Sequence, residues 1–177
     1  MRGKILFALT IFALGVSSPG ATRSPIVARF GSECRGDSFN PSPRLRKLIA
    51  RSAVRAYLFA KLPYGETAFA YDLDHDGRKE YFVRLACGGT GNCDWGIFST
   101  QPARLRGVVT GWFVFVQKPG ASWSGLTTYS RMGGDEGIID RFVYRRGKYV
   151  RVSTRVEHGY PGNWQPFLKR TGLPKCD

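Results

Sequence analysis

The chain has 177 residues, of which 27 are Lys or Arg and 13 are Asp or Glu, so its formal net charge at neutral pH is +14. This length suits one domain with a substantial core. No apolar stretch after the first 16 residues is long enough to span a bilayer, which excludes a multi-span membrane protein. The charge favours an anionic partner. The basic residues are spread along the chain, with no run of four, which is typical of a soluble basic envelope protein. The alternative is a specific anionic partner, for which we expect an envelope polymer or a glycan rather than nucleic acid.

The N-terminus has the three parts of a secretory signal peptide. Arg2 and Lys4 are basic, an apolar run covers Ile5–Val16, and small residues follow over Ser17–Ala21. This order predicts a signal peptide over residues 1–21 that is cleaved on export, so the protein is expected in the periplasm or outside the cell. The apolar run is short of the roughly 20 residues that cross a bilayer. The alternative is that it forms a buried N-terminal helix.

One helix is expected near the start of the mature chain. Residues 22–41 contain scattered Pro and Gly and are expected to be irregular, whereas residues 42–177 are expected to form a single β-rich domain. Ser42 can cap a helix and Pro43 suits its first turn. Apolar residues then recur at helical spacing until Pro63 and Gly65 end the pattern. The basic residues lie largely off that stripe, which predicts an amphipathic helix lying on a sheet.

From residue 66 the hydrophobic period changes to that of strands. Short β-branched and aromatic segments separated by turn residues are expected to be strands over Thr67–Tyr71, Tyr81–Cys87, Asp94–Phe98, Leu105–Val109, Trp112–Val116, Leu126–Tyr129, Ile138–Tyr144 and Tyr149–Val156. The clearest hairpin turns at Arg146 and Gly147, with Val150, Val152 and Thr154 expected on one face. The predicted fold is α+β, mainly β, with one N-terminal amphipathic helix packed on an antiparallel sheet or open barrel.

Four cysteines in an exported chain predict disulfides. Three pairings are possible. Cys87 and Cys93 enclose five residues, Gly-Gly-Thr-Gly-Asn, a flexible loop that lets the two sulfurs meet, while Cys34 and Cys176 lie near the two ends of the mature domain. We therefore expect bridges between Cys87 and Cys93 and between Cys34 and Cys176. A zinc site would need C-x-x-C spacing and a reducing compartment, and the chain meets neither condition.

The segment from Asp72 to Glu80 has the pattern D-x-D-x-D-G-x-x-E and predicts a calcium site. Calcium takes six to eight oxygen ligands, many of them from carboxylates. The expected ligands are the side chains of Asp72, Asp74, Asp76 and Glu80 and the backbone carbonyl of Arg78. The segment is not an EF-hand, because its twelfth position is Val83 and strands flank it. The alternative is a solvated Asp-Gly turn without a metal.

The loop resembles the calcium loops of FG-GAP and VCBS-type β modules. Together with the following C-G-x-x-G-x-C turn at Cys87–Cys93, it resembles a loose group of small exported bacterial proteins of unknown function. The resemblance covers residues 66–98, and it implies a structural calcium ion held by the residues named above and a local disulfide at that turn. The loop occurs once, which excludes a multi-blade propeller.

No enzyme class stands out in the sequence, and a non-enzymatic, monomeric binding module is expected. The alternative is a small envelope hydrolase that uses His158 as a general base with Glu157 or Asp135 as the nearby acid. Aromatic and basic residues in Gly- and Pro-rich loops suggest a ligand patch for a polyanion or glycan, made of Trp123, Tyr160, Trp164, Lys118 and Lys169.

Overall fold

The computed structural model describes residues 26–32, 34, 36, 39–56, 68–118, 122–133 and 136–158. These residues form one helix and nine strands. In chain order they are β1 (Ile26–Gly31), α1 (Pro43–Ala56), β2 (Ala68–Tyr71), β3 (Glu80–Cys87), β4 (Cys93–Thr100), β5 (Ala103–Gly111), β6 (Phe113–Gln117), β7 (Leu126–Arg131), β8 (Gly137–Arg145) and β9 (Lys148–Glu157).

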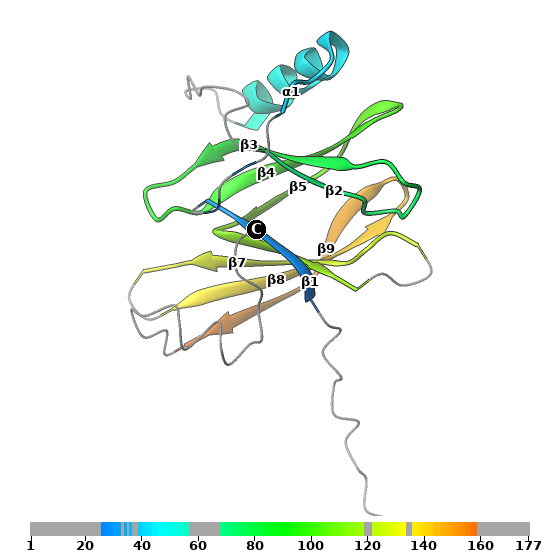
Figure 1. Ribbon diagram of the computed structural model, residues 1–177. Coiled ribbons are helices and arrows are strands. Elements are labelled where there is room, and N and C mark those ends of the chain that lie inside the picture. Colours follow the sequence, from blue (N-terminus) through cyan, green and yellow to red (C-terminus); the bar gives the residue numbers. More distant parts are fainter. Residues whose placement is uncertain are drawn as a thin grey trace, which may run out of the picture.

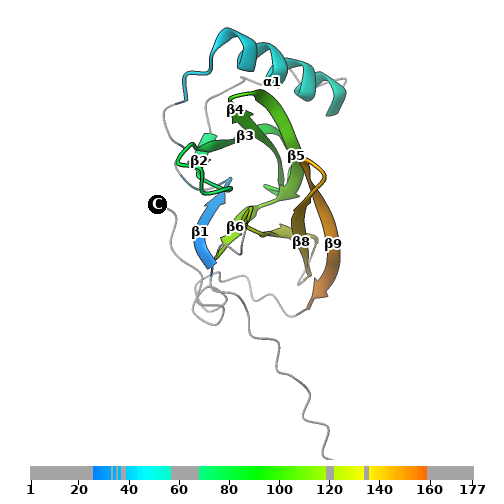
Figure 2. The same cartoon turned by 90° about the vertical axis from the view of Figure 1, so that its right-hand side faces the viewer.

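The strands form two antiparallel sheets that face each other (Figures 1 and 2). One sheet has the order β1-β6-β7-β8-β9 and the other has the order β2-β3-β4-β5. Except for β1, neighbours in each sheet are consecutive in the chain and are joined by hairpin connections. The fold is therefore mainly β with one helix, which confirms the expected class. The antiparallel strands form two facing sheets rather than one.

The main core lies between the two sheets. Alternate residues of a strand point to the same side. Large side chains on the inner faces of the two sheets therefore meet between the layers. Phe30 of β1 stacks on Phe69 of β2 with ring centroids 4.9 Å apart, and Phe69 in turn packs against Trp95 of β4 at 5.4 Å. The first contact crosses from one sheet to the other and holds the layers together, and the second extends the aromatic cluster along the inner face of the four-stranded sheet.

Helix α1 covers the outer face of the four-stranded sheet (Figure 2). Ser42 caps it, because its hydroxyl accepts the backbone N–H of Leu45 at 3.3 Å. Leu45 and Ile49 are buried and form a second apolar cluster with residues of the sheet, namely Ala68, Val83, Leu85 and Phe98. Basic side chains on the other side of the helix are exposed, at Arg44, Arg46, Lys47 and Arg51.

Two sequence expectations about strands are corrected. The segment 22–41 was expected to be irregular, yet Ile26–Gly31 pairs with β6 as an edge strand of the larger sheet. In the hairpin of β8 and β9, Phe142 pairs with Arg151 and Arg141 pairs with Ser153. The extra residue between them, a β-bulge, reverses the alternation of faces, so Val150 and Thr154 no longer share one side.

Other expectations concern residues that the structure does not describe. The signal peptide over residues 1–21 and the predicted end of the helix at Pro63 lie outside the described residues. Within the part of the chain that is described, no helix combines the length and the hydrophobicity needed to cross a membrane.

Candidate metal centre

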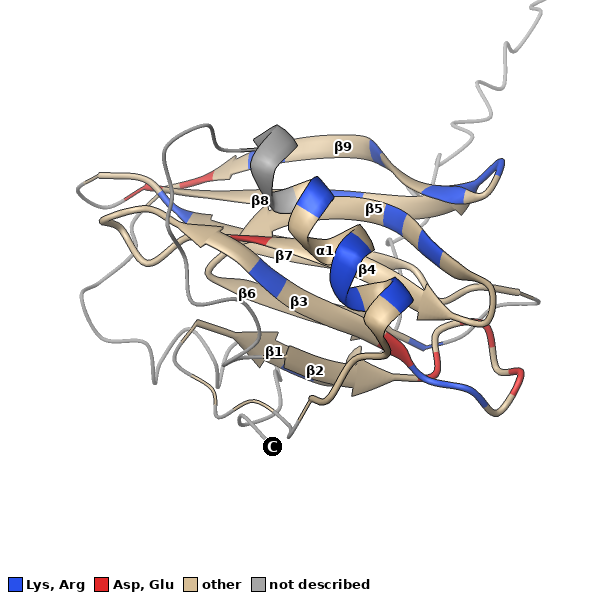
Figure 3. Ribbon diagram, turned by 90° about the horizontal axis from the view of Figure 1, so that it is seen from above, with Lys and Arg blue, Asp and Glu red and all other residues tan. Residues whose placement is uncertain are grey.

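The acidic segment forms the connection between β2 and β3, at one end of the sandwich (Figures 1 and 3). The backbone of this connection is tightly curled, with positive φ angles of 63° at His75 and 83° at Gly77. No atom lies within 4 Å of the position that a Cβ would take at Gly77, so the left-handed backbone rather than crowding favours glycine there.

Side-chain oxygens of the loop accept its own backbone N–H groups. Asp72 Oδ2 accepts the N–H of Gly77 at 3.0 Å, and Asp76 Oδ1 accepts the N–H of Arg78 at 2.7 Å. A third bond closes the loop, because Glu80 Oε2 accepts the N–H of Leu73 at 3.0 Å. These bonds tie the acidic side chains to the backbone of the loop, and the third fixes Glu80, the first residue of β3, against the start of the loop.

Three carboxylates meet in the centre of the loop. Asp72, Asp74 and Glu80 each offer one oxygen, and these oxygens lie within 4.8 Å of one another. Calcium–oxygen distances of about 2.3–2.6 Å place two ligands on opposite sides of one ion roughly 5 Å apart, so this spacing fits a shared cation. Oδ1 of Asp72 is buried and has no hydrogen-bond partner among the described residues. The donor set therefore fits a hard divalent ion.

The protein alone leaves this cluster electrostatically unfavourable. Glu80 is only 4% exposed. Burial, together with the charges of Asp74, Asp76 and Asp72, raises the pKa of Glu80 to about 7, against the lowering effect of its bond from Leu73. Burial, with the charges of Asp76 and Asp72, also raises the pKa of Asp74. Both shifts mean that the ionised carboxylates are poorly stabilised by what surrounds them.

The loop is anchored to the opposite sheet. The side chain of Leu73 is fully buried in the core between the sheets. Its carbonyl accepts the N–H of Ser124 at 2.7 Å, and the carbonyl of Ser124 accepts the hydroxyl of Tyr149 at 2.9 Å. His75 Nε2 lies 3.2 Å from Ser124 Oγ, so this exposed residue is in contact with the neighbouring segment rather than only with solvent. The loop thus contacts the connection to β7, and that connection is in turn bonded to strand β9.

Asp76 and Arg78 lie outside the cluster of three. Both are exposed, and the carboxylate of Asp76 is engaged by the amide of Arg78. The ligation expected of the Asp76 side chain and the Arg78 carbonyl therefore stays a prediction.

One of the two predicted disulfides is confirmed in full. Cys87 and Cys93 form a bridge across the turn between β3 and β4, with their Cα atoms 4.0 Å apart. Cys34 is also disulfide-bonded. Its expected partner, Cys176, lies outside the described residues, so that pairing stays a prediction.

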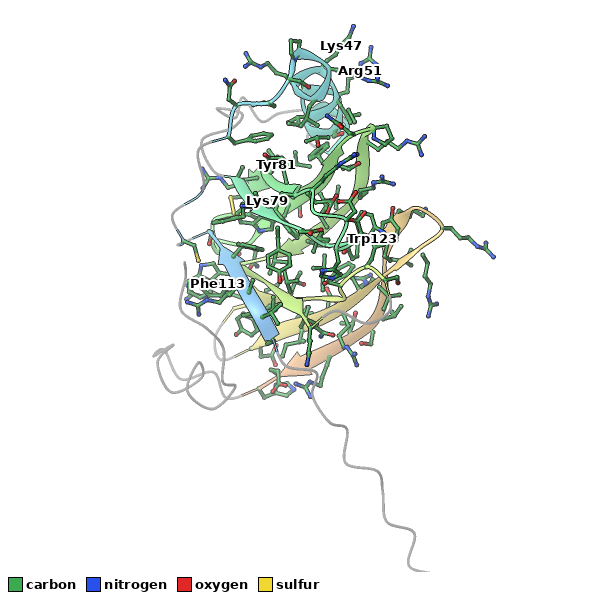
Figure 4. All side chains as sticks on the ribbon, turned by 45° about the vertical axis from the view of Figure 1, so that its right-hand side comes forward. Lys47, Arg51, Lys79, Tyr81, Phe113 and Trp123 are labelled. Atoms are coloured by element: carbon green, nitrogen blue, oxygen red, sulfur yellow. A yellow bond between two sulfur atoms is a disulfide. The ribbon has the colours of Figure 1, made fainter. Side chains whose placement is uncertain are left out.

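The predicted ligand patch stays a prediction, because the structure describes only two of its five residues, Trp123 and Lys118. Trp123 is half-buried and stacks on Tyr144, with ring centroids 3.8 Å apart and planes 8° apart. The guanidinium of Arg106 lies 5.3 Å from the Trp123 ring and donates to the Tyr144 hydroxyl at 2.9 Å. Figure 4 shows Trp123 between the two layers. Lys118 is exposed, and the other three members, Tyr160, Trp164 and Lys169, lie outside the described residues.

The candidate general base is paired with a different acid from those expected. His158 Nδ1 lies 3.1 Å from Glu136 Oε1, and both side chains are more than half exposed. Glu157 instead contacts Arg155, and Asp135 lies outside the described residues. Exposure of both partners leaves their pair in water rather than in a pocket.

The comparisons with known proteins identify no relative. No family model, no curated protein and no solved structure matches this chain. The resemblance to FG-GAP and VCBS-type loops stays a prediction.

Sequence reasoning missed the residues that hold the loop from outside. Ser124 and Tyr149 are separated from it by about 50 and 75 residues along the chain and carry no motif. One signal was present, since Leu73 is an apolar residue within an acidic loop. Such a residue indicates that the loop is packed against a core rather than projecting into water.

Proposed function

We propose that the chain is an exported, non-enzymatic binding module whose β2–β3 loop holds one structural calcium ion. The supporting observation is the convergence of Asp72, Asp74 and Glu80, with a buried Asp72 oxygen that has no hydrogen-bond partner among the described residues. An unsatisfied buried carboxylate oxygen costs folding free energy, and a bound cation removes that cost.

The donor chemistry favours calcium over the transition metals. The cluster offers only carboxylate oxygens, whereas zinc and copper sites in proteins are usually rich in His or Cys ligands. Backbone carbonyls of a curled loop and water can complete a shell of six to eight oxygens around calcium. Magnesium demands nearly ideal octahedral geometry and holds its waters tightly, so it is the weaker competitor.

The ion would act on the fold rather than on a substrate. The loop accepts a hydrogen bond from Ser124 in the connection to β7, Ser124 in turn accepts one from Tyr149 of β9, and the loop inserts Leu73 between the layers. A cation that fixes the loop therefore also fixes the contact between the two sheets at this end. For that reason we propose that calcium stabilises the fold.

The binding role is supported by the charge distribution. Helix α1 presents several basic side chains and no acidic one on its exposed face. Figure 3 shows this stripe, and Figure 4 shows Lys47 and Arg51 extending away from the sheets. A surface of this kind attracts anionic polymers of the cell envelope. Export is supported by the N-terminal sequence and by the Cys87–Cys93 bridge, which suits an oxidising compartment.

The experiment is a thermal melt of the mature chain in millimolar calcium and in excess chelator. We expect calcium to raise the melting temperature of the wild type and to have little effect on Asp74→Asn. Glu136→Gln is the matched control, because it removes an exposed acid outside the loop and should keep the full calcium response. Equal melting temperatures of the wild type in calcium and in chelator would refute the structural role.

The hydrolase alternative has one observation in its favour, the contact of His158 with Glu136. An imidazole beside a carboxylate can act as a general base. It predicts an esterase or glycosidase activity that His158→Ala abolishes without changing the melting temperature. Activity that is absent, or that survives this substitution, rejects it.

A further inference from the structure

A pocket lies at the end of the sandwich opposite the acidic loop. The acidic loop precedes β3 and the disulfide turn follows it, so β3 places the two at opposite ends (Figure 1). A pocket of about 400 Å³ opens beside the disulfide turn. Its volume falls within the range of roughly 300–1,000 Å³ that small-molecule sites occupy. It is lined by Ser32, Arg84, Cys87, Gly89, Thr90, Gly91, Cys93, Trp112 and Arg131.

The charge of this pocket is positive. Arg84 and Arg131 come from β3 and from the end of β7, and no carboxylate is among the lining residues. Neither guanidinium forms an ion pair with any residue that the structure describes. Two uncompensated guanidinium groups facing one cavity provide planar, multidentate donors for a carboxylate or phosphate.

Uncharged donors complete the lining. The turn holds its shape through bonds from Gly88 N to Asn92 O and from Gly91 N to Gly88 O, at 2.8 and 3.0 Å. The N–H groups of Gly89 and Thr90 take part in no hydrogen bond with the described residues. Successive free N–H groups in a glycine-rich turn form a concave site for an anion.

One residue that lines the pocket has a buried hydroxyl. Ser32 Oγ is buried and has no hydrogen-bond partner among the described residues, although it lines this pocket. A buried polar group without a partner is unfavourable unless a ligand or water supplies the bond. This observation is independent of the two arginines and of the turn.

One of the two cationic groups, that of Arg131, is held in place by its neighbours. The Arg131 guanidinium lies over the Trp112 ring, 4.1 Å from its centroid. The backbone N–H and carbonyl of Arg131 bond to the side chain of Asn92 at 2.8 and 2.6 Å, which ties the end of β7 to the disulfide turn. Such stacking and anchoring reduce the entropy that the pocket loses when it binds.

We propose that this pocket binds a sugar-sized unit carrying one oxyanion, either a carboxylate or a phosphate. The inference rests on the proposed binding function, to which it adds the site where a unit of an anionic polymer is recognised. It does not depend on the metal, because the two sites lie at opposite ends of β3 and share no residue.

The test uses the folded mature chain, saturated with calcium, in amide NMR titrations with three sugars. Glucuronate carries the carboxylate, glucose 6-phosphate carries the phosphate, and glucose is the neutral match. We expect one or both acids to shift the amides of Gly89 and Thr90 and the indole N–H of Trp112, while glucose does not. The acid that binds more tightly identifies the source of the oxyanion.

Variants make the test specific to the pocket. Arg84→Gln and Arg131→Gln should each weaken binding by about tenfold or more, as expected for the loss of a charged hydrogen-bonding partner. Arg131→Gln keeps the backbone bonds to Asn92 and so preserves the turn. Arg104→Gln is the control, because Arg104 is an exposed arginine of β5 that does not line the pocket, and its affinity should equal that of the wild type.

Three results would overturn the inference. They are equal shifts with glucose and with the acids, shifts that sodium chloride of the same ionic strength reproduces, and equal losses of affinity in the Arg84, Arg131 and Arg104 variants. Failure here leaves the calcium melt unchanged, and failure of the calcium melt leaves this titration unchanged, so the two proposals are separately tested.

Discussion

The N–H of Ser124 donates to the carbonyl of Leu73 at 2.7 Å, joining the loop of one sheet to the segment that leads into β7 of the other. Leu73 is fully buried and lies between Asp72 and Asp74, two of the three clustered acids. The same loop therefore carries both the packing contact and the cation cluster. Stability of the sheet-to-sheet contact and occupancy of the metal site should be linked.

Leu73→Ala should destabilise the protein by about 2–5 kcal/mol, because it removes a fully buried side chain from the core between the sheets and leaves a cavity. Urea unfolding in the presence of calcium measures the change. Leu105→Ala is the control, since Leu105 is 36% exposed and its truncation should cost much less. Equal losses in the two variants would show that the loop does not contribute its leucine to the core.

Glu80→Gln should change how stability depends on pH. In the calcium-free protein, the unfolded chain releases this proton near pH 4.5, whereas burial and the neighbouring acids hold the folded pKa near 7. The contribution of Glu80 to the free energy of unfolding is therefore fully present below about pH 4.5 and is lost as the pH rises to about 7.

Urea unfolding of the wild type and Glu80→Gln in chelator between pH 4 and pH 8 tests this dependence. The free energy of unfolding of the wild type should fall relative to that of Glu80→Gln across that window, because only the wild type has a carboxyl at position 80 that loses a proton. In calcium, the wild type should instead gain stability over the same range, since the ionised carboxylate becomes a ligand. A difference that is flat with pH in chelator would contradict the raised pKa.

Replacing Cys87 and Cys93 together by Ala should lower the free energy of unfolding by about 2 kcal/mol, because the bridge closes a short loop in the unfolded chain. Urea unfolding without reductant measures the loss. Thr90→Ala, an exposed change inside the same turn, should have almost no effect. If the double substitution were neutral, the bridge would be irrelevant to stability.

Sequence patterns predicted the strands from β2 onward because β-branched and aromatic segments there are separated by turn residues, which is a local property of the sequence. The acidic loop was predictable for a related reason, since its spacing of acids and glycine reflects local backbone geometry. Its anchoring was not, because the hydrogen bonds from Ser124 to Leu73 and from Tyr149 to Ser124 depend on how two sheets come together.

The errors have similar physical origins. Strand β1 was missed because Ile26–Gly31 is short and lies among Pro and Gly residues, and only its pairing with β6 makes it a strand. The prediction of which β9 side chains share a face was wrong, because a bulge opposite Arg141 and Phe142 changes the alternation of side chains. Trp123 was expected to be exposed because its loop is polar, yet tertiary stacking on Tyr144 covers it. In each case the deciding contact is distant in the chain.

The most direct test of the calcium site is isothermal titration of the chelator-treated mature chain with calcium at pH 8, where Glu80 is ionised. We expect one ion per chain, with a dissociation constant anywhere up to the roughly 10⁻⁴–10⁻³ M of extracellular modules, and loss of binding in Asp72→Asn/Asp74→Asn. The absence of any binding heat or of any calcium-induced shift in loop amide resonances at millimolar calcium would contradict it.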